Sequence, residues 1–258
     1  MQLGIVTYNI ARDWDLPTIL ERLEELGYAG VELRTTHAHN VEVNLSAAER
    51  RDVRRRFENS PVELAGLGSA FEYHSTDPAE VRRNIEGTKA YVRLAHDIGA
   101  PGVKVRPNGV PQGADLEATF RQIGEALHEV GEDAAGFGVE IRVEVHGAVT
   151  SDLRNFARIL HHAHHPNVFT CWNSNPTDVV DGSVKTSFAQ VATTIREVHL
   201  RDLFLPDYPW RELFALLDAQ GYEGYTLAEI PESPDPMRVL RYFQALWHAY
   251  QPPARNPR

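Results

Sequence analysis

The sequence predicts one α/β domain, a (β/α)8 barrel with eight parallel strands and outer helices. The chain has 258 residues, close to the roughly 250 that such a barrel needs. Strand-like and helix-like segments alternate from end to end, which indicates parallel strands joined by helical crossovers. An open nucleotide-binding sheet would need a glycine-rich turn after its first strand, but that turn reads Tyr-Asn-Ile-Ala-Arg. A closed barrel is therefore the better prediction.

The expected strands are short runs in which Val, Ile and Leu recur. In chain order they are Leu3–Tyr8, Gly30–Arg34, Glu63–Ser69, Gly102–Arg106, Glu140–His146, Val168–Asn173, Glu197–Leu200 and Tyr225–Ile230. The helices expected between and after them are Leu16–Leu26, Ala47–Glu58, Pro78–Ile98, Leu116–Gly136, Asp152–His164, Val184–Ile195, Pro209–Gln220 and Pro234–Tyr250.

Several of these helices carry start and stop signals. Ser46 and Glu49 have the spacing of a capping box, and Asp77 precedes a proline that suits a first helical turn. Gly27 and Gly99 follow the last residues of two helices, where a left-handed residue commonly ends a helix. These local signals agree with the alternating pattern.

Composition limits the classes of protein that this chain can represent. No linker divides it, so residues 1–250 are expected to form one domain and residues 251–258 a flexible tail. The single cysteine, Cys171, and the lack of a basic leader favour a reducing, cytoplasmic setting. No segment has the length of a membrane span. The net charge of −10 disfavours nucleic acid as a partner. A homo-oligomer remains open.

Alternate residues of several expected strands are apolar and charged. In the fifth strand, Ile141 and Val143 share one face, while Arg142 and Glu144 share the other. The outer face of a barrel meets the helices and must be apolar, so the charged face is expected to point inward. The same alternation places further polar residues inside: Glu32, Arg34, Lys104, Arg106, His146, Glu197, His199 and Arg201.

Inward charges are costly unless they pair with one another or bind a ligand. A structural ion-pair network best explains the charges that lie deep or early in their strands: Glu32, Arg142 and Glu197. Active sites of such barrels form at the carboxyl ends of the strands. Four titratable residues are expected at those ends: Glu144, His146, His199 and Glu229.

The ends of the last four strands bring together Glu144, Asn173, His199 and Glu229 if the barrel closes. Carboxylate and amide oxygens with one imidazole suit a divalent ion, with Mn²⁺ or Mg²⁺ favoured and Zn²⁺ or Co²⁺ as alternatives. Further residues that could contact a substrate on this face are His146, Lys104, Arg106, Arg201 and His37.

The chain at this point resembles the xylose isomerase-like TIM barrels, a family that includes sugar-phosphate isomerases and epimerases. The resemblance rests on residues 27–34 (Gly-Tyr-Ala-Gly-Val-Glu-Leu-Arg) and on the four strand ends, and it covers nearly the whole chain. It implies a metal held by glutamate, aspartate, histidine and glutamate from strands five to eight. Glu144, His199 and Glu229 match this set, and the resemblance implies that the two glutamates also form the acid–base pair.

The sixth strand departs from the family pattern. The family usually has aspartate there with a histidine three residues later, whereas this chain has Asn173 and Pro176. Asparagine can ligate through its oxygen but adds no charge, so weaker metal binding is expected, with Asn175 or Asp178 as additional candidate ligands.

The expected function is a metal-dependent isomerase or epimerase that moves a proton beside the carbonyl of a small, sugar-like substrate. Two alternatives stay open: a dehydratase or lyase that acts on a keto-sugar or cyclitol by the same enolisation, and a non-catalytic sugar-binding barrel whose metal site has decayed. Apurinic endonucleases share this barrel, but they need more histidine and aspartate ligands, and the acidic charge disfavours DNA.

Overall fold

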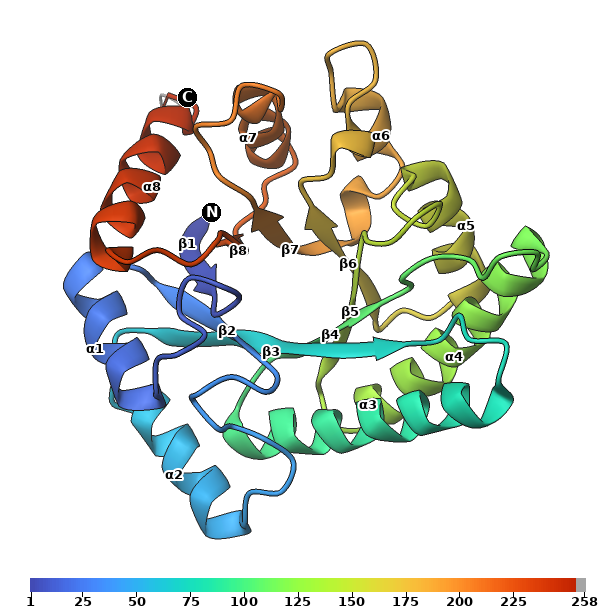
Figure 1. The fold of residues 1–258 in the computed structure, drawn as a ribbon, viewed down its shortest axis with the longest axis horizontal. Coiled ribbons are helices and arrows are strands. Elements are labelled where there is room, and N and C mark those ends of the chain that lie inside the picture. The colour runs from blue at the N-terminus through green and yellow to red at the C-terminus, as the bar shows by residue number, and fades with distance from the viewer. Residues whose placement is uncertain (254–258) are drawn as a thin grey trace.

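Eight parallel strands close into a barrel in chain order, from β1 to β8, in a computed structural model that describes residues 1–253 (Figure 1). The strands are β1 (Gln2–Val6), β2 (Gly30–Arg34), β3 (Glu63–Glu72), β4 (Gly102–Arg106), β5 (Glu140–Glu144), β6 (Val168–Asn173), β7 (Ile195–Leu200) and β8 (Tyr225–Ala228). Figure 1 shows the helices as a ring around the strands. They are α1 (Leu16–Leu26), α2 (Ala47–Glu58), α3 (Pro78–Ile98), α4 (Leu116–Ala135), α5 (Leu153–Ala163), α6 (Lys185–Ala189), α7 (Trp210–Ala219) and α8 (Pro236–Tyr250). The predicted fold is confirmed.

The barrel closes between its first and last strands. Gly4 of β1 lies opposite Gly30 of β2 on one side and opposite Leu227 of β8 on the other. This closure brings the carboxyl ends of all eight strands to one face. The predicted flexible tail, residues 251–258, falls largely outside the described residues, because they stop at 253.

The helix signals in the sequence work as expected. The Ser46 side chain accepts from the backbone of Glu49, whose carboxylate accepts in return from the Ser46 backbone. Asp77 caps α3 by accepting from the Ala79 N–H. Gly27 and Gly99 adopt φ of 71° and 84°, the left-handed conformation that ends α1 and α3.

The helix expected over Val184–Ile195 is wrong in extent. Only Lys185–Ala189 is α-helical, a 3₁₀ turn covers Ala192–Thr194, and β7 begins at Ile195, two residues earlier than expected. Successive β-branched residues at 193–195 lose side-chain freedom in a helix and fit a strand better. Other strand ends differ by a few residues. β8 stops at Ala228, so Glu229 lies just beyond the strand.

The alternation in the strands sorts their side chains as expected. Ile141 and Val143 are fully buried against the helix layer, while Arg142 points inside the barrel and donates to Glu197 at 2.8 Å. Arg142 also donates to the carbonyl of Ala65 at 2.8 Å. A Cβ at Gly102 would lie 2.5 Å from the Arg142 Nε, so glycine there makes room for the guanidinium. The interior of the barrel, away from the carboxyl ends of the strands, is therefore filled by an ion-pair network around Arg142.

None of the helices within residues 1–253 combines the length and the apolar character that crossing a bilayer requires.

Candidate active site

A cavity of about 470 Å³ opens at the carboxyl ends of the strands. Its lining includes residues from or just after every strand except β3: Tyr8, Asn9, Arg34, Lys104, Arg106, Glu144, His146, Asn173, Arg201, Asp202, Leu205, Glu229, Ile230 and Pro231. Seven of the predicted site residues are in this set, whereas His37, His199 and the two additional candidate ligands Asn175 and Asp178 are not. His199 is fully buried and contacts Glu229 of the lining. The structure therefore brings most of the sequence-predicted residues to one place.

Glu144, His199 and Glu229 form a compact cluster of ligand-type atoms. One carboxylate oxygen of each glutamate and one ring nitrogen of His199 all lie within 4.8 Å of one another. The His199 Nδ1 lies 3.6 Å from Glu229 Oε2, and it is buried without a hydrogen-bond partner from the residues that the structure describes. A buried nitrogen that lacks a partner and faces two carboxylates is a fitting ligand for a cation.

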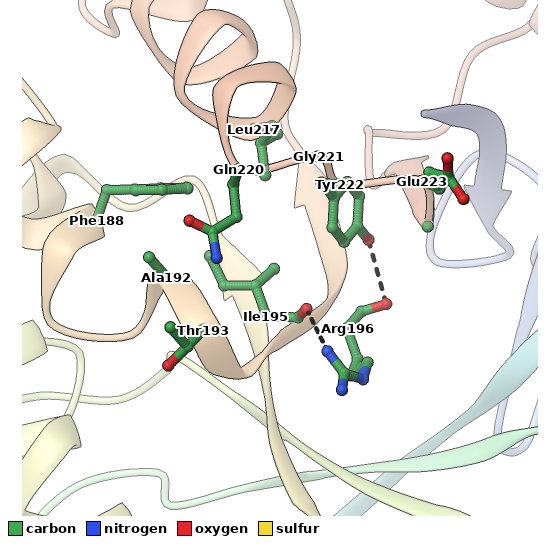
Figure 2. A pocket seen from close by; sticks show the side chains of 11 residues that line it. Phe188, Ala192, Thr193, Ile195, Arg196, Leu217, Gln220, Gly221, Tyr222 and Glu223 are labelled. Atoms are coloured by element: carbon green, nitrogen blue, oxygen red, sulfur yellow. Dashed lines mark hydrogen bonds between the residues drawn. The ribbon is translucent and has the colours of Figure 1, made fainter.

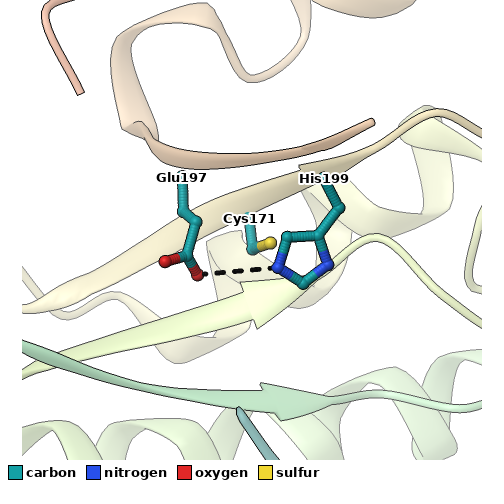
Figure 3. A group of neighbouring side chains, drawn as sticks. All are labelled: Cys171, Glu197 and His199. Carbon is teal, nitrogen blue, oxygen red and sulfur yellow. Dashed lines mark ion pairs between the residues drawn. The ribbon is translucent and has the colours of Figure 1, made fainter. Parts of the chain in front are cut away.

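The other nitrogen of His199 is held by carboxylates deeper in the barrel. Nε2 lies 3.3 Å from Glu32 Oε2 and 3.9 Å from Glu197 Oε2, and Figure 3 draws the second of these contacts beside Cys171. This arrangement turns Nδ1 toward the cavity, as the carboxylate partners of metal-binding histidines commonly do. A cluster of Cys171, Glu197 and His199 also has ligand spacing, but burial raises the pKa of the Cys171 thiol to about 12, so it remains a neutral thiol at ordinary pH.

Burial opposes the charged forms of His199 and Glu32, but neighbouring groups outweigh it: His199 stabilises the Glu32 carboxylate, while Cys171, Glu32 and Glu229 stabilise the charged imidazole. The pKa of Glu32 falls to about 2, and the pKa of His199 rises well above its ordinary value. A protonated imidazole cannot ligate a metal, so metal binding here would release a proton from His199.

Glu144 is tied by two polar partners. Lys104 donates to its Oε2, and the Asn173 amide donates to its Oε1 at 3.1 Å. Burial disfavours both charges, but the Lys104 ammonium lowers the pKa of Glu144, and Glu144 in turn raises the pKa of Lys104. Glu144 and Lys104 thus form a buried ion pair at the wall of the cavity.

The donor set fits a divalent metal ion. Two carboxylates and a partner-free imidazole nitrogen converge, and the Asn173 side chain touches one of the carboxylates. The two additional candidate ligands point elsewhere. Asn175 donates to the carbonyl of Val145 at 2.6 Å, and Asp178 accepts from the Tyr208 hydroxyl at 2.9 Å. Only Asn173 is therefore left as a fourth ligand from the region of β6.

Asp178 is a fully buried carboxyl group whose protonation affects stability. Burial raises the pKa of Asp178 to about 8, and the hydrogen bond from Tyr208 offsets this only in part. The folded protein then holds this proton up to about pH 8, whereas the unfolded chain loses it near pH 4. The stabilising contribution is therefore complete below about pH 4 and is lost as the pH rises toward 8.

We expect Asp178→Asn to flatten this loss of stability, because asparagine stays neutral and still accepts from Tyr208. At pH 8.5 the variant should be more stable than the parent protein by about 1–3 kcal/mol, with a smaller difference at pH 5. Urea unfolding at both pH values measures this. Asp181→Asn, an exposed change in the same loop, is the control. Parallel pH profiles for the parent and Asp178→Asn would contradict the prediction.

The remaining predicted substrate contacts differ in their placement. His146 lines the cavity, and its Nδ1 contacts the Asn108 side chain at 2.7 Å. Arg106 and Arg201 also line it. His37 does not line the cavity, and its Nδ1 contacts Thr7 Oγ1 at 2.9 Å. Burial is the main cause that lowers the pKa of His37 to about 4.

Arg34 was missed as a cavity residue. It is the last residue of β2 and shares the inward face with Glu32, so the rule applied to the ends of the later strands would have found it. Tyr8 and Asn9 follow β1 and carry no such signal, because they lie in an irregular turn.

A second cavity lies at the opposite end of the barrel (Figure 2). It measures about 210 Å³ and surrounds the start of β7, where Ile195, Arg196 and Tyr222 lie close together. The Tyr222 hydroxyl donates to the Arg196 carbonyl at 3.1 Å. Residues at this amino-terminal face of a barrel serve stability rather than catalysis, so we place no active site here.

Three comparisons bear on this arrangement. A family model described as "Xylose isomerase-like TIM barrel" matches residues 20–246. A mouse protein named "Putative hydroxypyruvate isomerase" is 23% identical over 261 residues, which cover 90% of this chain and 91% of the mouse protein.

Solved structures share the fold at low identity. D-psicose 3-epimerase from Clostridium cellulolyticum H10, solved with D-tagatose, superimposes with a TM-score of 0.82 at 13% identity, over 98% of this chain and 100% of its own. The IOLI protein, solved with a bound zinc atom, gives 0.80 at 18% identity, over 97% of this chain and 98% of its own.

Proposed function

This chain belongs to the xylose isomerase-like TIM barrel family, and from that premise we propose that it is a metal-dependent isomerase of a small, sugar-like α-hydroxy carbonyl compound. The observation that carries the proposal is the cluster of Glu144, His199 and Glu229 at the floor of the cavity. The relatives' names support proton transfer beside a carbonyl, but they include both an isomerase and a 3-epimerase.

Glu144, His199 and Glu229 would hold the divalent ion, with the Asn173 amide oxygen as the fourth ligand. Such an ion would draw electron density from the substrate carbonyl and make the neighbouring C–H acidic. The preferred ions are Mn²⁺ and Mg²⁺, since most of the donor atoms are oxygens, while the single imidazole also suits Zn²⁺ or Co²⁺.

The two glutamates differ in their freedom to move a proton. Glu144 is 3% exposed and bound by Lys104 and Asn173, whereas the side chain of Glu229 is 22% exposed and contacts His199. Glu229 is therefore the better general base. It takes the proton from the hydroxyl-bearing carbon beside the carbonyl, which leaves an enediolate. The hydroxyl proton then passes to the former carbonyl oxygen, and Glu229 returns its proton to the former carbonyl carbon. This one-base sequence gives isomerisation.

Epimerisation would need Glu144 to deliver a proton to the opposite face of the same carbon. Its ion pair with Lys104 disfavours this role, because a carboxylate that accepts from an ammonium is a weak base. Lys104 instead holds Glu144 in place and balances part of its charge.

The test of this function is deuterium incorporation from D₂O into α-hydroxy carbonyl compounds, followed by mass spectrometry, with and without Mn²⁺. Isomerisation places deuterium on the neighbouring carbon, epimerisation places it on the carbon whose configuration is inverted, and loss of water identifies a dehydratase. A protein that binds Mn²⁺ but incorporates no deuterium into any compound of a ketose and keto-acid panel would contradict the proposal and favour a non-catalytic barrel.

Asn173→Asp is expected to bind Mn²⁺ about tenfold more tightly, because it restores a negative ligand. Without metal the variant should be less stable than the parent protein, since the new carboxylate would repel Glu144 instead of donating to it. The metal-induced rise in melting temperature should therefore be larger in the variant. Calorimetric titration and thermal unfolding measure both effects.

Asn175→Asp is the matched control for this change. Asn175 lies two residues further on and points to the Val145 carbonyl rather than to the cluster. Its variant should keep the metal affinity of the parent protein. Equal affinities for Asn173→Asp and the parent would remove Asn173 from the ligand set.

A further inference from the structure

The cavity is rich in basic side chains although the chain as a whole is acidic. Its charged lining residues are Arg34, Lys104, Arg106 and Arg201 on the positive side and Glu144, Asp202 and Glu229 on the negative side. The net charge of the chain is −10, so this local excess of positive charge does not follow from composition. The excess is small, but its sign is opposite to that of the whole chain, and a concave site attracts ligands whose charge is opposite to its own.

Arg106 and Arg201 are each oriented by one carboxylate and retain further donors. Arg106 pairs with Glu72 through Nη2, and its Nε has no hydrogen-bond partner among residues 1–253. Arg201 pairs with Asp207 at 3.1 Å through Nη1, while its Nε and Nη2 find no hydrogen-bond partner in the described part of the chain. The Arg201 guanidinium also lies 5.4 Å from the centre of the Tyr208 ring, which fixes its plane. Both guanidinium groups are thus held at the cavity with donor capacity left over.

Arg34 differs from the other three cations, each of which is paired with a carboxylate. Its guanidinium donates to the carbonyl of Thr35 at 3.4 Å, and it forms no ion pair within residues 1–253. Lys104, by contrast, is neutralised by Glu144. A half-buried arginine without an anion, placed in a cavity, offers the planar donor pair that carboxylate and phosphate groups bind best.

We infer that the substrate of this cavity is anionic, an α-hydroxy carbonyl compound that carries a carboxylate or phosphate group, and that Arg34 binds this group with Arg106 and Arg201 beside it. The inference rests on the proposed function for the identity of the site, and it narrows the substrate class. The reacting carbons lie toward Glu229 and the anionic end toward Arg34. A neutral ketose would leave Arg34 without a partner.

Equilibrium binding to the metal-loaded protein tests this with three compounds that share a three-carbon polyol frame: glycerol, glycerate and glycerol 3-phosphate. At least one of the two anions should bind at least about tenfold more tightly than glycerol, because its charged group forms charge-assisted hydrogen bonds with arginine. Tighter binding of glycerate identifies the anionic group as a carboxylate, and tighter binding of glycerol 3-phosphate identifies it as a phosphate. Glycerol binding as tightly as both anions would overturn the inference.

Arg34→Gln should lower the affinity for the preferred anion by about tenfold or more and leave the affinity for glycerol within about twofold. Arg34→Lys should recover part of the loss, because lysine keeps the charge but not the paired donors. Arg12→Gln is the control, since Arg12 is an exposed arginine nearby that pairs with Asp13 and does not line the cavity. An equal loss for glycerol and the anions in Arg34→Gln, or an equal loss in Arg12→Gln, would contradict the role of Arg34.

These measurements do not depend on turnover. If the protein incorporated no deuterium into any substrate, the proposed function would fail while the preference for anions could still be measured. If deuterium exchange occurred with neutral ketoses and no anion bound more tightly, the proposed function would stand and the inference about the substrate class would fail.

Discussion

Replacing Glu229 with glutamine is expected to lower α-proton exchange by about 10³-fold, because the protein then lacks the general base that takes the proton from the substrate. The change keeps the shape of the side chain and leaves an amide oxygen that can still ligate. Mn²⁺ affinity should therefore fall much less than exchange does. Deuterium incorporation at saturating Mn²⁺, together with a calorimetric metal titration, separates the loss of the base from the loss of the metal.

Two further variants make this result specific. Glu232→Gln removes the same charge three residues later, at an exposed position outside the cavity lining, and should leave exchange unchanged. Glu144→Gln should weaken metal binding and lower exchange, because Glu144 is the proposed ligand that Lys104 holds. Undiminished exchange in both Glu229→Gln and Glu144→Gln would exclude the glutamate pair from proton transfer.

The largest effect on stability is expected from Arg142→Met. Arg142 is 6% exposed inside the barrel and donates to Glu197 and to the Ala65 carbonyl. Its removal leaves a buried carboxyl group and a buried carbonyl without their donor. A buried polar group that loses its hydrogen-bond donor costs about 1–3 kcal/mol, so the two groups together should cost about 2–6 kcal/mol. Urea unfolding at pH 7 measures the change in the free energy of unfolding.

Arg196→Met is the matched control for Arg142→Met. The Arg196 side chain is 44% exposed, lies 3.5 Å from Glu140 and stacks over Phe169, so its loss should cost about 1 kcal/mol or less. Adding Glu197→Gln to Arg142→Met should recover only a small part of the stability at pH 7, because burial and the neighbouring Glu32 already raise the pKa of Glu197 to about 8 and keep its carboxyl group largely neutral. If Arg142→Met cost no more than Arg196→Met, the ion-pair network would not support the barrel.

The sequence was sufficient for the fold because its signals are local. Strands and helices alternate in it, and the two-residue period in β5 separates Val143 from Glu144 without reference to any other strand. The same period predicted that Glu32, Arg142 and Glu197 lie inside, and all three are buried. The failure in the segment after β6 was also local, since helical spacing there competed with β-branched residues that favour the start of β7.

The candidate site was only partly predictable. The strand-end rule identified Glu144, His199 and Glu229, which the structure brings within ligand distance of one another. It also suggested His37, which lies in the loop after β2 and outside the cavity lining. It passed over Arg34, the last residue of β2, which does line the cavity. Asp178 was a candidate ligand by spacing, yet it turns to Tyr208, because the direction of a loop side chain does not follow from strand periodicity.

The sequence by itself determined that this chain forms a barrel with charged side chains inside it. It also determined which residues lie at the carboxyl ends of the strands. Only the tertiary structure decided how those charges pair. Lys104 of β4 lies opposite Arg142 of β5 and pairs with Glu144, two residues further along the same face of that strand, whereas Glu229 follows β8 and contacts His199. Alternation fixes the face on which a side chain lies, but the partner across the barrel depends on strand register and closure, which bring together residues far apart in the chain.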